Sequence, residues 1–164
     1  MIPLIDGDVL AYRCGFASQT TFYHLSTEFG YLGEFEDKAS AKLAVSEHEL
    51  AEGSYELIPE IRAEPVANAL HSCKAQIQQC LDVCNATKCR VYLTGKTNYR
   101  NEEAVTYSYK GNRKDVSKPV HHQAIRDYML ERWDAILVEG IEADDALSIA
   151  VSYTHLTLPT TPYV

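Results

Sequence analysis

The chain begins with an apolar run, continues with an acidic turn and then shows a helical pattern. Ile2–Ile5 is apolar, and Asp6-Gly7-Asp8 forms a short polar segment. Apolar side chains then recur near the helical period, at Val9, Leu10 and Cys14. This order predicts a short strand, a tight turn and a helix.

Residues 15–88 alternate between strand-like and helix-like composition. The predicted elements are a hairpin at 20–36, a helix at 37–51, a strand at 55–61 and a helix at 65–85. Phe29-Gly30 lies where the hairpin should bend. Asp37 is placed to cap the first of these helices, and Pro65 is placed to open the second.

The rest of the chain repeats a strand and helix order. The predicted elements are a strand at 90–93, a helix at 119–133, a strand at 135–138 and a helix from residue 143. Between them, residues 98–117 are polar and basic without a clear period, which indicates a loop or a mobile helix. Strands that alternate with helices imply an α/β fold of three layers, with a mainly parallel sheet and helices on both faces.

The final segment, SYTHLTLPTTPYV at 152–164, differs from the rest of the chain. It is rich in Thr, contains two Pro and has no Asp, Glu, Lys or Arg. It also breaks the helical period that runs to Val151, and it resembles translated sequencing-adapter sequence. We therefore predict a domain at 1–151 and a non-native tail at 152–164.

Length and composition predict one soluble domain. The chain has 164 residues, of which 46% are hydrophobic and 23% are charged. No apolar run reaches the length of a membrane span, and the start lacks the pattern of a signal peptide. Five cysteines without a CxxC pair fit a reducing compartment. We expect a cytoplasmic protein without a membrane partner.

Charge is distributed unevenly along the chain. The overall net charge is -8, but residues 88–118 carry eight Lys or Arg against three acidic residues. The remaining residues carry seven basic and twenty acidic side chains. A basic segment on an acidic body suits a surface that grips phosphate at one edge while carboxylates elsewhere bind metal ions.

Two sets of carboxylates are expected at one edge of the sheet. Asp6 ends the first strand, and Glu142, Asp144 and Asp145 follow the last strand. Ligands of open parallel sheets bind beyond the carboxyl ends of strands, so both sets face one crevice if their strands are neighbours. An all-oxygen cluster selects Mg²⁺ or Mn²⁺, and phosphodiester hydrolysis is the natural use of such ions. Ordinary capping of a helix start is the alternative explanation.

The segment YKGNRK, at 109–114, is the second group of chemically informative residues. Lys110 and Arg113 share one face if the segment is helical, and they would present two cations to a backbone phosphate. Tyr109 could stack on an unpaired base. A solvated loop would have a similar composition.

Four segments together resemble a known family. In order, they are IDGDVLAYR, VYLTGKTNYR, YKGNRKDVSKP and GIEADDALS. They resemble the 5′ to 3′ exonucleases and flap endonucleases of bacteriophages and bacterial polymerases, a branch of the PIN-like nucleases. The similarity covers residues 2–13 and 90–150 and leaves 15–88 unmatched. It implies a PIN-like 5′ nuclease domain that acts on DNA with a 5′ end or a single-stranded flap.

The resemblance assigns roles to individual residues. Asp6, Glu142, Asp144 and Asp145 would hold the divalent metal, while Asp8 would cap the helix and support Asp6. The candidate catalytic residues are Asp6, Lys110 and Arg113, the last two contacting the scissile phosphate and the threaded strand. The candidate DNA-binding residues are Arg13, Arg100, Tyr109, Lys110, Arg113 and Lys114.

The sequence departs from the family in two places. The family usually has an acidic residue near the position of Leu93-Thr94-Gly95, and here there is none. It also supplies further aspartates after the EADD helix, whereas no acidic residue follows Asp145. The resemblance implies a two-metal site in a full-length protein, and we predict half of that site and weak or no catalysis for this sequence.

Three other functions are compatible with parts of the sequence. Asp6-Gly7-Asp8-Val9 resembles the opening motif of haloacid dehalogenase-type phosphatases, in which Asp6 would be the nucleophile and Asp8 the acid. A PIN-type ribonuclease and a DNA-binding module without catalysis are the other two. No nucleotide cofactor is expected, because TGKT at 94–97 has Arg90 where a phosphate-binding loop requires Gly.

Overall fold

The computed structural model describes residues 2–100 and 117–156 and contains two three-stranded sheets. The first sheet is parallel and has the order β1-β5-β6. Its strands are β1 (Leu4–Asp6), β5 (Arg90–Asn98) and β6 (Ile136–Gly140). The predicted α/β class with a parallel sheet is therefore confirmed, whereas the assignment to the PIN-like fold stays a prediction.

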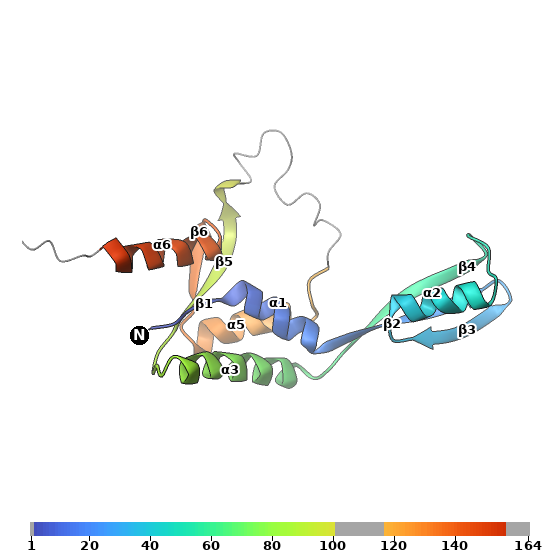
Figure 1. The fold of residues 1–164 in the computed structure, drawn as a ribbon, viewed down its shortest axis with the longest axis horizontal. Helices are drawn as coiled ribbons and strands as arrows, with labels where there is room; N and C mark the ends of the chain where they lie inside the picture. The colour runs from blue at the N-terminus through green and yellow to red at the C-terminus, as the bar shows by residue number, and fades with distance from the viewer. Residues whose placement is uncertain (1, 101–116, 157–164) are drawn as a thin grey trace, which may run out of the picture.

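Helices cover both faces of the parallel sheet (Figure 1). On one face lie α1 (Gly7–Ala17), α3 (Val66–Val83) and α5 (His122–Arg132), and on the other lies α6 (Ala143–Leu156). Side chains of β5 alternate between two cores: Val91 and Leu93 face the three helices, and Tyr92 faces α6. No helix in the described ranges combines the length and the apolar character that crossing a membrane requires.

Residues 19–63 form the second sheet, which the sequence pattern did not predict as a separate unit. The sheet is antiparallel, has the order β3-β2-β4 and is covered by α2. Its elements are β2 (Gln19–Thr27), β3 (Gly30–Phe35), α2 (Lys38–Glu47) and β4 (Tyr55–Ala63). Figure 1 shows this unit standing away from the parallel sheet. Every residue of β4 is paired with a residue of β2. The strands β2, β3 and β4 therefore form a sheet of their own and do not pair with the parallel sheet.

Most predicted element boundaries lie within about three residues of those in the structure, but α2 ends at Glu47 and not at residue 51, and β5 and α6 are longer than predicted. Asp37 caps α2 and Pro65 precedes α3, as expected. Strand β5 continues beyond Leu93 to Asn98. Helix α6 continues beyond Val151 to Leu156, so the predicted end of the domain lies inside a helix. No Pro occurs between Pro119 and Pro159, so residues 152–156 are free to continue the helix.

Gly7 gives the first testable prediction, because its α-carbon packs directly against β5. A Cβ at this position would lie 2.8 Å from the Tyr92 carbonyl oxygen and 2.9 Å from Val91 Cγ1. We expect Gly7→Ala to lower the free energy of unfolding by about 1 to 3 kcal/mol, measured by urea denaturation. Gly33→Ala is the control, since its Cβ would make ordinary contact with Phe35 at 3.4 Å. Equal stability of the two variants would contradict the close packing of α1 on β5.

Candidate active site

The strand order places the two predicted carboxylate sets on the outer strands of the parallel sheet. Asp6, the last residue of β1, is paired with Tyr92 of β5, and Tyr92 is paired in turn with Ile136 of β6. Strand β5 therefore separates the strand that carries Asp6 from the strand that precedes Glu142. The two sets share the carboxyl edge of the sheet, but their strands are not neighbours.

Arg100 brings two of the predicted metal ligands together. One guanidinium nitrogen, Nη2, lies 2.6 Å from Asp145 Oδ1, and the other, Nη1, lies 3.3 Å from Glu142 Oε2. The second carboxylate oxygen of Glu142 accepts a hydrogen bond from Asn98 Nδ2 at 3.0 Å. The guanidinium lowers the pKa of the Asp145 carboxyl group below its usual value. Two carboxylates are thus arranged around one positive charge at the start of α6.

The same acidic residues also cap α6, as the local explanation requires. Asp145 Oδ2 accepts a hydrogen bond from the Glu142 backbone N–H at 3.2 Å, and Asp144 Oδ1 accepts one from the Asp145 N–H at 2.9 Å. The Ala143 N–H donates to Thr94 Oγ1 at 3.0 Å. Capping explains part of the acidic run. It does not explain why Arg100 spans Glu142 and Asp145.

The roles expected for Asp6 and Asp8 require a correction. Asp6, not Asp8, is the N-cap of α1, because its Oδ1 accepts a hydrogen bond from the Val9 N–H at 3.0 Å. Asp8 lies inside the first turn and points toward β5 and α5. Its Oδ2 accepts a hydrogen bond from the Thr94 N–H at 2.9 Å, and its Oδ1 pairs with Arg126 Nη1.

Thr94 and Arg126 were not identified from the sequence, although they connect the elements around the site. Arg126 Nη2 donates to the Thr94 carbonyl oxygen at 2.6 Å, so β5, α1 and α5 meet at one residue. The Thr94 hydroxyl oxygen also accepts a hydrogen bond from the first N–H of α6. Thr94 occupies the region where the resembling family has an acidic residue. In this chain, Thr94 instead forms hydrogen bonds that connect β5 to α1, α5 and α6.

Glu139 is another residue that the sequence analysis missed. Its Oε2 accepts hydrogen bonds from the Lys96 N–H, the Thr97 N–H and the Thr97 hydroxyl, at 3.1, 3.1 and 2.7 Å. The Thr97 hydrogen bonds lower the pKa of the Glu139 carboxyl group. A Cβ at Gly95 would overlap this carboxylate, so a larger residue there would require the Glu139 side chain to move. The TGKT segment thus binds the carboxylate of Glu139.

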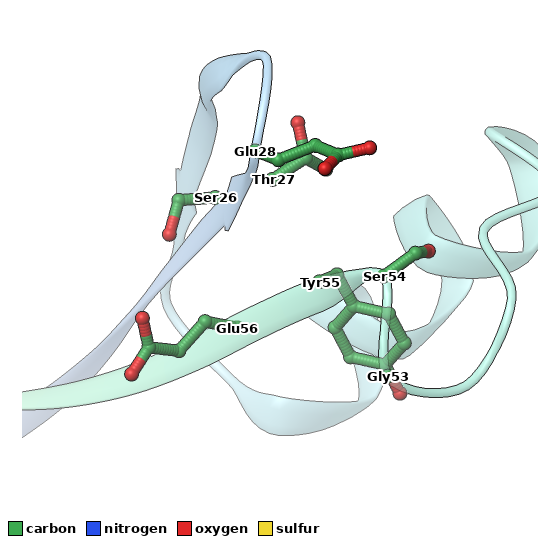
Figure 2. A pocket seen from close by; sticks show the side chains of 7 residues that line it. All are labelled: Ser26, Thr27, Glu28, Gly53, Ser54, Tyr55 and Glu56. Atoms are coloured by element: carbon green, nitrogen blue, oxygen red, sulfur yellow. The ribbon is translucent and has the colours of Figure 1, made fainter.

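The remaining predicted site residues lie either in a pocket beside α1 or outside the described residues. Arg13 and Asp6 line a pocket of about 340 Å³ that is formed by residues of β1, α1 and α3. Residues 109, 110, 113 and 114, which include the predicted Tyr109, Lys110, Arg113 and Lys114, lie outside the described residues. A larger hollow of about 630 Å³ is formed by residues 26–28 and 53–56 of the antiparallel sheet unit, and it contains none of the predicted site residues (Figure 2).

Among the described residues, the most closely grouped potential metal ligands are not the predicted ones; they are His24, Glu34 and Glu60. Within residues 2–100 and 117–156, the ligand atoms of His24, Glu34 and Glu60 all lie within 4.8 Å of one another. No three of Asp6, Glu142, Asp144 and Asp145 have ligand atoms grouped this closely. Asp6 is turned toward the N–H groups of α1, and a guanidinium lies between Glu142 and Asp145.

Comparison with known proteins finds no similar protein. The chain has no match among protein-family models, among curated proteins or among solved structures. Its function therefore has to be inferred from its own motifs and geometry.

Proposed function

We propose that this chain is a PIN-like, metal-dependent DNA nuclease domain that hydrolyses phosphodiester bonds at a 5′ end or a single-stranded 5′ flap. The order of the four motifs, which resembles the 5′ nucleases, supports this function. The observation that carries it is the pairing of Glu142 and Asp145 around Arg100 at the carboxyl edge of a parallel sheet. Ligands of open α/β sheets bind at this edge.

The donor atoms at this edge fit a hard divalent cation. The predicted ligands are all carboxylates, the ligand type that Mg²⁺ and Mn²⁺ prefer. The guanidinium between Glu142 and Asp145 indicates that this pair balances a positive charge. In the proposal these two residues would hold the ion, and Asp6 and Asp144 would be its further ligands. A bound ion of this type supplies charge to the phosphate and lowers the pKa of a water molecule.

Other side chains of the chain would bind and orient the nucleic acid. Arg100 can exchange its carboxylate partners for a phosphate, because a guanidinium forms paired hydrogen bonds with either group. Lys110 and Arg113 are proposed to hold the scissile phosphate and the entering strand. The contacts of Asp8 and Arg126 with Thr94 fix α1 and α5 to β5 and so keep the edge of the sheet in place.

A phosphatase of the haloacid dehalogenase type has less support. That chemistry requires Asp8 to donate a proton to the leaving group. Both carboxylate oxygens of Asp8 are occupied, one by Arg126 and the other by the Thr94 N–H. Asp6 is likewise occupied as a helix cap. Trapping a phosphoaspartate on Asp6 would favour the phosphatase over the nuclease.

A cleavage assay tests the proposed function. We expect the full chain to cut 5′-flap DNA slowly with Mg²⁺ and not at all with EDTA, and to cut an RNA flap of the same sequence less well. Lys110→Ala should raise KM or lower kcat without changing metal binding, whereas Lys74→Ala on the exposed side of α3 should leave both unchanged. Cleavage that resists EDTA, or cleavage by Lys110→Ala that equals cleavage by Lys74→Ala, would reject the proposal. Preference for RNA would favour the ribonuclease.

A further inference from the structure

The open face of the antiparallel sheet carries a histidine that lies against two carboxylates. His24 Nε2 lies 2.6 Å from Glu60 Oε2 and 3.7 Å from Glu34 Oε2. The three residues come from the three strands of the sheet, β2, β3 and β4. Leu25, the next residue of β2, is fully buried. Since side chains alternate along a strand, His24 points to the opposite face.

The strand register explains why these three side chains converge. His24 is directly opposite Glu34 in the β2-β3 pairing. Glu60 is opposite Phe22 in the β2-β4 pairing, which makes it a diagonal neighbour of His24. Both carboxylates therefore reach the same ring nitrogen from strands on either side of β2. The backbone hydrogen bonds of the sheet hold this arrangement in place.

The other nitrogen of the imidazole also has a partner. His24 Nδ1 lies 3.4 Å from the Tyr31 hydroxyl group. A hydrogen-bond partner on the second nitrogen is the usual arrangement for a histidine that binds a metal, because it fixes the orientation of the ring. Tyr31 thus directs Nε2 toward Glu34 and Glu60.

Arg62 prevents the two carboxylates from repelling each other when no other cation is present. Its guanidinium donates to both oxygens of Glu34, at 2.9 and 2.6 Å, and to Glu60 at 2.8 Å. It also lies over the Phe22 ring, 4.4 Å from the ring centroid. With one guanidinium and two carboxylates, the group keeps one net negative charge when the imidazole is neutral. That charge, together with a convergent imidazole nitrogen, favours a divalent cation.

We propose that His24, Glu34 and Glu60 bind a divalent transition-metal ion of the Zn²⁺ type, at a site separate from the carboxyl edge of the parallel sheet. One imidazole nitrogen and two carboxylate oxygens form a ligand set that suits such ions and leaves a position open to solvent. Ligands at about 2.1 Å from a tetrahedral ion are roughly 3.4 Å apart. Small rotations that separate His24 from Glu60 and draw Glu34 closer satisfy this spacing.

Metal titration of the full chain tests this site. We expect one equivalent of Zn²⁺ to bind in calorimetry, and Co²⁺ to produce visible absorption bands typical of a nitrogen and oxygen ligand set. His24→Ala and Glu60→Gln should each weaken binding by at least about tenfold. Asp145→Asn should leave this binding unchanged, which separates the site from the proposed nuclease site.

Two variants serve as matched controls. His71→Ala removes an exposed histidine of α3, and Glu56→Gln removes an exposed carboxylate of β4, four residues before Glu60. Both should bind Zn²⁺ like the unmodified chain. Circular dichroism checks the fold of every variant, and Glu60→Gln, which has nearly the same shape as the original residue, decides the result if His24→Ala unfolds. Failure of the unmodified chain to bind one equivalent, or equal losses in targets and controls, would overturn the proposal.

Discussion

Asp145→Asn is expected to lower Mg²⁺-dependent cleavage of 5′-flap DNA by at least about a hundredfold, because loss of a ligand should exceed the 10- to 100-fold effects typical of outer-shell residues. The substitution keeps the size of the side chain and can still accept the hydrogen bond from the Glu142 N–H. It removes the negative charge that now balances Arg100. The loss should therefore lie in metal-dependent chemistry and not in folding. Initial rates across a range of Mg²⁺ concentrations measure it.

The design of this experiment separates chemistry from DNA binding. Flap-DNA affinity in EDTA should not fall in Asp145→Asn, since removing a carboxylate reduces repulsion of phosphate. Glu142→Gln should behave in the same way, because Glu142 shares the Arg100 guanidinium. Glu131→Gln, at an exposed position near the end of α5, is the carboxylate control. If Asp145→Asn cuts as fast as Glu131→Gln, the residues at the start of α6 do not form the active site.

Arg126→Gln should produce the largest loss of stability among the side-chain substitutions considered for this domain, about 2 to 3 kcal/mol. Arg126 is 14% exposed and Asp8 is 23% exposed, so water can only partly replace their contact. The substitution also leaves the Thr94 carbonyl oxygen without its donor from α5. The free energy of unfolding in urea measures the effect.

Two further variants test which contact of Arg126 accounts for the loss of stability. Arg126→Lys keeps the charge but cannot contact Asp8 and the Thr94 carbonyl oxygen in the same paired geometry, so it should be intermediate. Arg132→Gln changes an exposed arginine in the last turn of the same helix and should cost little. A loss in Arg126→Gln no larger than in Arg132→Gln would show that the Asp8 contact contributes nothing to stability.

The Arg126 contact illustrates why part of the site could not be predicted from the sequence. Asp8 and Arg126 are 118 residues apart, and neither lies in a pattern that indicates the other. Asp6 and Asp8 look equivalent in the sequence as helix caps, and only the position of the helix start distinguishes them. In the same way, Arg100 was predicted to bind DNA, and only the structure shows its contacts with Glu142 and Asp145.

The sequence by itself determined the kinds of elements and their order, because periodicity and turn residues record local burial and local backbone preference. The hairpin, the Asp37 cap and the strand that follows α5 could all be read in this way. Strand order, register and the pairing of distant charges were decided only by the tertiary structure. Placing β5 between β1 and β6, and bringing Glu60 against His24, depends on backbone hydrogen bonds between segments far apart in the chain. The sequence of either segment alone does not identify the distant segment that pairs with it.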